Sequence, residues 1–255
     1  MPRPAVLIVD ADNTLWDTNQ VFANAQLAMI RSLEEHGCRF PEPPLEALRR
    51  IDRRLAREFG KFEYDFSLLA ERLMDEYFPG EMPSADRELA AQGAAAELGS
   101  TLSTTPDLLP GATDLLRWIR DSRAHGARLA AILISEGDKS RLMRIASAHH
   151  LDHGTFDRIE VLATKTAEVF QDAVSWGRLA VGTPSPVCIA IGDSIERDMR
   201  PARTAGCVTI YKPAGFHGNE RSTTSEAEPD YRVSDLTEAL AITQELLNES
   251  PEAGA

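Results

Sequence analysis

Long apolar runs and cysteines are both scarce in this sequence. No stretch comes near the ~18 uninterrupted apolar residues that a membrane span requires, and the apolar run after residues 1–4 is too short for a signal peptide. The three cysteines, Cys38, Cys188 and Cys207, lie far apart and show no CxxC spacing. We therefore expect a soluble cytoplasmic protein with no membrane contact, whose thiols are buried in a reducing compartment.

Basic residues are also fewer than acidic ones. Lysine and arginine together number 27 against 40 aspartates and glutamates, so the formal net charge is -13 and the pI is ≈ 4.9. Because nucleic-acid affinity depends largely on a basic surface that neutralises phosphates, no nucleic-acid partner is expected. An anionic substrate would need local help from a metal ion or a well-placed lysine. The sequence carries no indication of the oligomeric state.

Short apolar runs, separated by amphipathic segments of helical length, indicate the strands of a buried sheet. The runs cover residues 5–9, 129–134, 187–191 and 208–211. Continuous rather than alternating apolar character is typical of parallel strands that are covered on both faces. The predicted fold class is therefore α/β, with a doubly wound parallel sheet.

The gap between the first two runs is too long for one crossover helix. Its apolar residues recur at helical spacing in three stripes, within residues 21–29, 45–55 and 66–77. Proline-containing breaks interrupt this pattern at residues 41–44, 79–83 and 104–110. A helical domain inserted into the α/β domain is the simplest explanation.

These patterns predict the domain boundaries. We expect an α/β core built from residues 1–16 and 110–248, a helical cap over 17–109 and a disordered tail over 249–255. Within the core, residues 215–229 are rich in Gly, Ser, Thr and Glu and are expected to form an exposed loop. Residues 231–233 are expected to form a short edge strand, followed by a closing helix over 236–247.

The sharpest chemical motif follows the first apolar run directly. Residues 10–14 read Asp-Ala-Asp-Asn-Thr, which places the carboxylates of Asp10 and Asp12 two residues apart where a strand ends. Ligands of open parallel sheets collect at this edge. Of two acids so close, one can act as nucleophile and the other as proton donor and acceptor. Thr14 adds a hydroxyl to this motif. A helix-capping pair is the simpler alternative.

Two weaker candidates follow later in the chain. Ser135 directly follows the second apolar run. Its hydroxyl would lie beside Asp10 if these strands are neighbours. Lys165 precedes a predicted helix and could stabilise the charge of a phosphoryl group in transfer; Lys139 is the rival. A helix cap and a solvated surface lysine are the alternatives for these positions.

The third long run ends in Gly192-Asp193-Ser194, with Asp198 five residues after Asp193. The glycine permits an abrupt turn, and a further carboxylate reaches the same edge of the sheet. Carboxylates and water are the ligands that Mg²⁺ prefers, so Mg²⁺ is the expected cofactor. An Asp-Ser helix cap would explain this motif alone, but not several acidic strand ends together.

Taken together, these motifs resemble the haloacid dehalogenase-like (HAD) hydrolase superfamily. The resemblance is to its phosphatase branch, which has a Rossmann-like core and a helical cap inserted after the first motif. It rests on residues 10–14, Ser135, Lys165 and the Gly-Asp-Ser-Ile-Glu-Arg-Asp segment over 192–198. These residues span most of the chain, and their order and spacing make chance agreement improbable.

The resemblance implies a Mg²⁺-dependent phosphohydrolase that acts on a small phosphorylated metabolite. Asp10 would attack phosphorus to form an aspartyl phosphate, while Asp12 would protonate the leaving oxygen and then activate water. Asp10, the Asp12 carbonyl and Asp193 would bind the metal. The resemblance implies that Ser135 and Lys165 bind the phosphoryl oxygens, together with the Thr14 hydroxyl. It implies supporting roles in the site for Asp198 and Ser194.

Two departures and two alternatives remain open. Ser135 stands where the family often has Thr, and Thr166 follows Lys165 where Pro is frequent, which leaves the choice between Lys165 and Lys139 to the structure. Asp12 argues against the dehalogenases of the superfamily, which lack an acid at that position. The alternatives are a phospho-accepting signalling module without turnover, and a phosphotransferase or phosphonatase. The substrate and the cap residues that contact it do not follow from the sequence.

Overall fold

The computed structural model describes residues 2–60, 64–151, 154–214 and 228–248. Within them the chain forms two compact units, one made of residues 1–18 and 106–255 and the other of residues 19–105. The predicted cap, 17–109, differs from the second unit by a few residues at each end. The predicted tail over 249–255 and most of the predicted loop over 215–229 lie outside the described residues.

The first unit is built on a parallel sheet of six strands in the order β3-β2-β1-β4-β5-β6. The strands are β1 Ala5–Asp10, β2 Leu129–Glu136, β3 Arg158–Leu162, β4 Val187–Gly192, β5 Val208–Tyr211 and β6 Tyr231–Arg232. The central strand β1 is buried along its whole length. The doubly wound α/β fold predicted from the apolar runs is confirmed.

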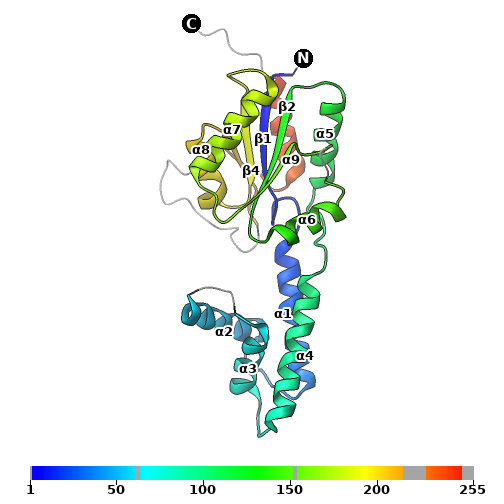
Figure 1. The fold of residues 1–255 in the computed structure, drawn as a ribbon, viewed down its shortest axis with the longest axis vertical. Helices are drawn as coiled ribbons and strands as arrows, with labels where there is room; N and C mark the ends of the chain where they lie inside the picture. Colours follow the sequence, from blue (N-terminus) through cyan, green and yellow to red (C-terminus); the bar gives the residue numbers. More distant parts are fainter. Residues whose placement is uncertain (1, 61–63, 152–153, 215–227, 249–255) are drawn as a thin grey trace. The chain divides into compact units, whose positions relative to one another are not determined.

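Helices cover both faces of this sheet (Figure 1). One face carries α5 Ala112–Ala124, α6 Lys139–Ala148 and α9 Leu236–Asn248, and the other carries α7 Ala167–Val181 and the short α8 Arg200–Thr204. Because side chains alternate along a strand, Leu7 packs in the first layer and Ile8 in the second. The continuous apolar pattern of β1 follows from this double coverage.

Strand β3 was not anticipated from the sequence. Its first four residues alternate between charged and apolar side chains, in the order Arg158, Ile159, Glu160 and Val161. Every residue of β3 is half-buried, because the strand lies at the edge of the sheet and pairs only with β2. An edge strand needs no continuous apolar run, so its signal in the sequence is weaker.

The second unit contains four helices, α1 Thr18–Glu35, α2 Pro44–Phe59, α3 Phe66–Tyr77 and α4 Ser84–Leu102. Helix α1 begins at the last residue of the first unit. The unit has its own hydrophobic core, in which Met29, Leu48, Leu73 and Ala94 are buried. Among the described helices of the whole chain, none is long and apolar enough to cross a bilayer.

The chain leaves and re-enters the first unit through two adjacent segments. The amide of Asp17 donates to the carbonyl of Asp107 at 2.9 Å, and the amide of Leu109 donates to that of Leu15 at 2.9 Å. Trp16 and Leu108 form an antiparallel bridge between them. Since these ends lie side by side, a long insertion leaves the sheet intact.

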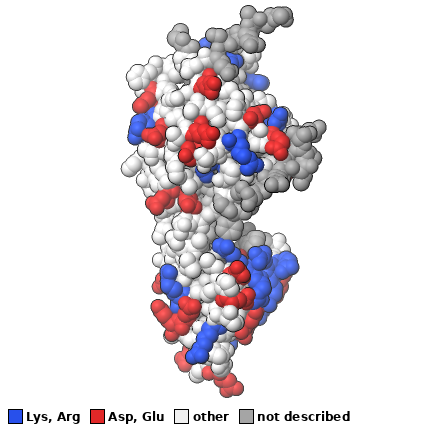
Figure 2. Space-filling view, turned by 180° about the vertical axis from the view of Figure 1, so that it is seen from behind, with Lys and Arg blue, Asp and Glu red and all other residues white. Residues whose placement is uncertain are grey.

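Charge on the surface is mixed despite the excess of acids. Figure 2 shows acidic and basic side chains interspersed on one face of the molecule. In the helical unit, Arg50 pairs with Glu42 at 3.1 Å and also with Glu76, which lies 3.7 Å from Arg54. Exposed pairs of this kind contribute roughly 0–1 kcal/mol each, so they are a minor part of the stability of the unit.

Close packing of α7 on β1 gives a stability prediction. A Cβ on Gly177 would lie 2.5 Å from Cγ2 of the buried Val6, so Gly177→Ala should lower the free energy of unfolding. We expect a net loss of about 1–2 kcal/mol, because overpacking outweighs the gain in helix propensity. Urea unfolding measures this change.

Gly93→Ala is the matched control. Gly93 is also helical, and nothing lies within 4 Å of the corresponding Cβ position. This variant should be neutral or stabilised by up to ~1 kcal/mol. Equal stabilisation by both substitutions would contradict the close contact between α7 and β1.

Candidate active site

The carboxylate of Asp10 lies at the carboxyl end of the central strand. Asp10 is the last residue of β1 and is 6% exposed. The chain then turns through Asn13, whose φ of 60° is left-handed. This turn brings the Thr14 hydroxyl back to donate to Asp10 Oδ2 at 2.6 Å. Thr14 therefore orients Asp10 in this structure.

Lys165 meets Asp10 from a loop 155 residues away in sequence. Its buried ammonium group donates to Asp10 Oδ1 and, at 2.6 Å, to Asp198 Oδ1. The Lys165 amide donates to Glu136 Oε1 at 2.7 Å, which ties the loop before α7 to the end of β2. Lys139, the rival from the sequence, is exposed at the start of α6. The structure places Lys165, and not Lys139, against Asp10.

The ion pair between Asp10 and Lys165 is charged at neutral pH. Burial raises the pKa of Asp10 to about 6, against the opposing effects of Lys165 and Thr14. Burial alone would lower the pKa of Lys165, but the carboxylates of Asp10 and Asp198 outweigh it and raise that pKa above its ordinary value. Both shifts leave a carboxylate facing an ammonium near pH 7.

Asp193 and Asp198 come from the turn after β4. A five-residue π-helix, Ile195–Met199, turns Asp198 back so that its Oδ2 accepts from the Ser194 amide at 3.0 Å. The Ser194 hydroxyl in turn accepts from the Arg197 amide at 3.3 Å. A Cβ at Gly192 would lie 2.6 Å from the Asp198 side chain, so a residue without Cβ is needed there.

The carboxylates of Asp10, Asp193 and Asp198 form a cluster that fits a divalent cation. One oxygen from each lies within 4.8 Å of the others. Asp193 Oδ2 is buried and has no hydrogen-bond partner among the described residues. Burial, reinforced by Asp10 and Asp198, raises the pKa of Asp193 to about 8. A hard cation such as Mg²⁺ would satisfy the unpaired oxygen and relieve this repulsion.

Asp12 is held by three donors outside this cluster. Its Oδ1 accepts from Trp16 Nε1 at 2.8 Å and from the Thr18 hydroxyl. Arg141 Nη1, from α6, lies 3.2 Å from both oxygens of Asp12. Sequence analysis did not select Arg141, because it stands 129 residues from Asp12 and belongs to none of the motifs.

Ser135 lies on the neighbouring strand, as expected. Strand β2 pairs with β1, and Asp10 is opposite Ile134, one residue before Ser135. The strand continues to Glu136, two residues beyond the predicted end. The buried Ser135 hydroxyl donates to the Glu136 carbonyl at 3.3 Å. A phosphate-binding role for Ser135 stays a prediction.

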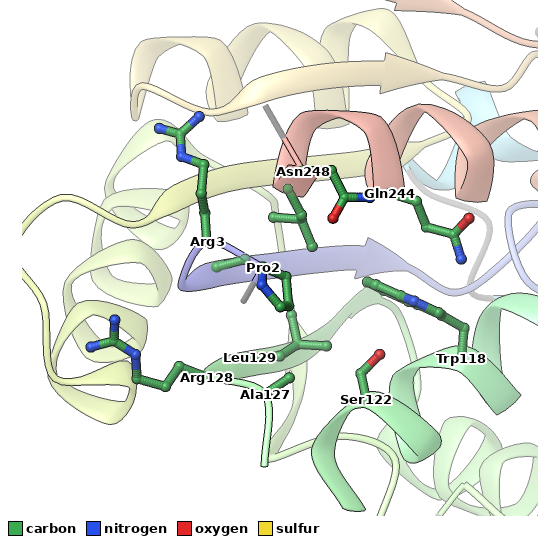
Figure 3. A pocket seen from close by; sticks show the side chains of 11 residues that line it. Pro2, Arg3, Trp118, Ser122, Ala127, Arg128, Leu129, Gln244 and Asn248 are labelled. Carbon is green, nitrogen blue, oxygen red and sulfur yellow. The ribbon is translucent and has the colours of Figure 1, made fainter. Parts of the chain in front are cut away.

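A cavity lies elsewhere in the first unit. It has a volume of ≈ 370 Å³ and is found where β1 and β2 begin, at the edge opposite Asp10. Trp118 and Leu129 line it, while the guanidinium groups of Arg3 and Arg128 point away from its centre (Figure 3). The carboxylates and Lys165 therefore define the candidate site, which lies away from this cavity.

Comparisons with known proteins point to the same superfamily as the sequence motifs. The sequence model of the HAD-hydrolase-like family matches residues 164–239, which include Lys165, Asp193 and Asp198. This match bears out the resemblance to the haloacid dehalogenase-like superfamily that the motifs indicated. It is 24% identical over 245 residues to a glyceraldehyde 3-phosphate phosphatase of Methanopyrus kandleri, covering 94% of this chain and 97% of that protein.

Solved structures of the superfamily share the fold over nearly the whole chain. A haloacid dehalogenase-like family hydrolase from Xanthomonas campestris has a TM-score of 0.65 at 19% identity, covering 97% of each chain. The putative HAD-hydrolase YfnB from Bacillus subtilis, which was solved bound to magnesium, has a TM-score of 0.59 at 20% identity. That likeness covers 97% of this chain and 100% of YfnB.

The acidic cluster predicts how Mg²⁺ binding depends on pH. Because a proton and the cation compete for Asp193, whose pKa is about 8, Mg²⁺ affinity should rise between about pH 6 and about pH 8 and then level off. Each pH unit should change the dissociation constant by up to about tenfold. Isothermal titration calorimetry measures the constant, and Asp193→Asn should bind Mg²⁺ weakly throughout.

The stability of the metal-free protein should fall with rising pH, whereas its Mg²⁺ affinity rises. A carboxyl whose folded-state pKa lies above its ordinary value of 3.8 favours folding while it is protonated. The contribution of Asp193 is therefore lost as pH rises through about 8, and saturating Mg²⁺ should restore it. Thermal unfolding that is insensitive to Mg²⁺ at every pH would contradict a cation site here.

Proposed function

We propose that this chain is a Mg²⁺-dependent phosphohydrolase that cleaves a small phosphomonoester through an aspartyl phosphate on Asp10. The observation that carries this proposal is the buried Lys165 ammonium group, which joins Asp10 to Asp198 beside the unpaired oxygen of Asp193. A lysine and a cation site around one carboxylate suit phosphoryl transfer, which depends mainly on positioning and charge stabilisation.

The relatives support the same reaction class. One is named as a glyceraldehyde 3-phosphate phosphatase, and a predicted phosphoglycolate phosphatase from Haemophilus somnus shares the fold with a TM-score of 0.54 at 16% identity. Both names describe small phosphorylated metabolites as substrates. Such substrates are consistent with a cytoplasmic location. The three cysteines are free and buried, which is also consistent with a reducing compartment.

In the proposed first step, an Asp10 carboxylate oxygen attacks phosphorus while the bond from phosphorus to the leaving oxygen breaks. Asp12, in its protonated form, gives its proton to that oxygen, so an alcohol departs. In the second step, Asp12 takes a proton from water, whose oxygen attacks the phosphorus of the aspartyl phosphate. Inorganic phosphate leaves, and Asp10 and the proton on Asp12 are regenerated.

Other residues would bind and orient the reacting groups. Lys165 and Ser135 would contact the phosphoryl oxygens, and the Thr14 hydroxyl would hold Asp10 in its attacking orientation. The carboxylates of Asp10 and Asp193, with the Asp12 carbonyl, would hold Mg²⁺. When bound, Mg²⁺ would offset the repulsion between these carboxylates and a phosphate dianion.

A phosphotransferase or a phospho-accepting module would use much of the same machinery. A putative β-phosphoglucomutase from Thermotoga maritima shares the fold, with a TM-score of 0.59 at 16% identity. Asp12 favours turnover over a stable phosphoprotein, because an acid held by Arg141, Trp16 and Thr18 is poised for proton transfer. Phosphate release to water, without any acceptor, would distinguish hydrolysis.

Substitution of the nucleophile tests the proposal. Asp10→Asn removes the attacking carboxylate with little change in volume, so phosphate release should fall at least about a thousandfold. A screen of phosphorylated metabolites with Mg²⁺ present measures it, and Asp121→Asn, on the exposed surface of α5, serves as the control. Equal turnover by Asp10→Asn and the wild type would remove Asp10 from the mechanism.

Substitution of Arg141 tests how Asp12 is positioned. Arg141→Met removes both contacts to the Asp12 carboxylate, so kcat should fall about tenfold with a smaller change in KM. Arg120→Met, which alters an exposed arginine of α5, should leave kcat unchanged. Steady-state kinetics on the best substrate decide this, and unchanged kcat in Arg141→Met would show that Asp12 is positioned without Arg141.

A further inference from the structure

A second buried lysine stands at the carboxyl edge of the sheet. Lys212 follows β5 directly and is 5% exposed. Its backbone amide donates to the Gly192 carbonyl at 2.9 Å, which ties it to the end of β4 just before Asp193. Lysine is rarely buried to this extent without a specific partner. The motifs in the sequence did not single out this residue.

The partner of Lys212 is the turn that carries Asp10 and Asp12. Lys212 Nζ donates to the Asn13 carbonyl at 2.8 Å, across 199 residues of sequence. Asn13 is the left-handed residue of this turn and stands between Asp12 and Thr14. The Lys212 side chain therefore fixes the backbone from which both predicted catalytic acids project.

The charge of Lys212 is not neutralised by a direct ion pair. Lys165 contacts two carboxylates, whereas no carboxylate among the described residues lies within salt-bridge distance of Lys212. Burial lowers the pKa of Lys212, and the nearby carboxylates, of which Asp193 has the largest effect, oppose that shift. The ammonium group of Lys212 thus interacts electrostatically with the carboxylate cluster without contacting it, and its direct contact is the Asn13 carbonyl.

Charge balance shows what this second lysine does. In the described part of the chain, the buried charged residues are Asp10, Lys165, Asp193, Asp198 and Lys212. When all five are ionised, as they are once a cation displaces the proton of Asp193, three carboxylates and two ammonium groups carry one net negative charge, which the divalent cation converts to one net positive charge. Without Lys212, the loaded site would be neutral and would attract a phosphate dianion less strongly.

We propose that Lys212 is a positioning residue of the phosphoryl site, which holds the turn over residues 10–14 and supplies a second fixed positive charge. This charge favours the phosphoryl group and disfavours the cation, so its removal shifts the two affinities in opposite directions. A purely structural lysine would not do this, because damage to the site weakens both ligands. The proposal rests on the proposed function.

The test measures both affinities in Lys212→Met. Isothermal titration calorimetry of the metal-free protein gives the Mg²⁺ dissociation constant, which should fall by about threefold to tenfold. The inhibition constant for inorganic phosphate at saturating Mg²⁺ should rise by about the same factor. Lys139→Met, at the exposed start of α6, should change neither constant.

A second variant separates charge from hydrogen bonding. Lys212→Gln keeps a donor for the Asn13 carbonyl but loses the charge, so both constants should shift as in Lys212→Met, with a smaller loss of kcat. This variant also supplies the two constants if circular dichroism shows Lys212→Met to be unfolded. Weaker binding of both ligands, or no change in either, would overturn the proposal.

Failure of this inference is distinguishable from failure of the proposed function. A wild-type protein that neither binds Mg²⁺ nor releases phosphate from any phosphomonoester would overturn the function itself. A wild-type protein that does both, with Lys212 variants that match it in both constants, would overturn only the role of Lys212.

Discussion

The candidate site depends on one buried arrangement of charges, in which Lys165 joins Asp10 and Asp198. Burying carboxylates and an ammonium group removes them from water at a large cost, which their mutual attraction offsets only with good geometry. Replacing such a group by apolar residues of similar volume is often neutral or stabilising for a fold. Stability alone therefore gives little reason to bury three carboxylates and two lysines in this interior, whereas the proposed phosphoryl chemistry requires them.

The sheet makes that arrangement possible. Each charged residue stands at or just beyond the carboxyl end of a strand or in the loop after it, and the strands are fixed by apolar layers on both faces. Glu136 adds rigidity, because it accepts from the Lys165 amide and from the Arg197 side chain at 3.3 Å. The sheet and these hydrogen bonds thus hold the charged side chains in fixed positions, which the proposed phosphoryl chemistry would need.

The helical unit has a separate physical basis. Its core is independent of the sheet, and the two segments that connect it to the first unit are joined by backbone hydrogen bonds between residues 15–17 and 107–109. An element with its own core, attached through adjacent strands, can vary in sequence without disturbing the carboxylate cluster. The sequence of the helical unit and that of the carboxylate cluster can therefore vary independently.

The sequence by itself determined the fold class, the insertion and the main acidic residues, because these depend on local patterns. A buried parallel strand must be continuously apolar, and a residue that follows such a strand must lie at the ligand-binding edge. Asp10 and Asp193 were selected in this way, whereas Lys165 was selected from its place before a predicted helix and from the family resemblance. Strand β3 was not, since an edge strand tolerates charged residues on its exposed side. Only the tertiary structure placed Lys165, and not Lys139, against Asp10, and only it brought Arg141 to Asp12 and Lys212 to Asn13. Those contacts join side chains that are distant in sequence and carry no local pattern, so they exist only once the strands have aligned.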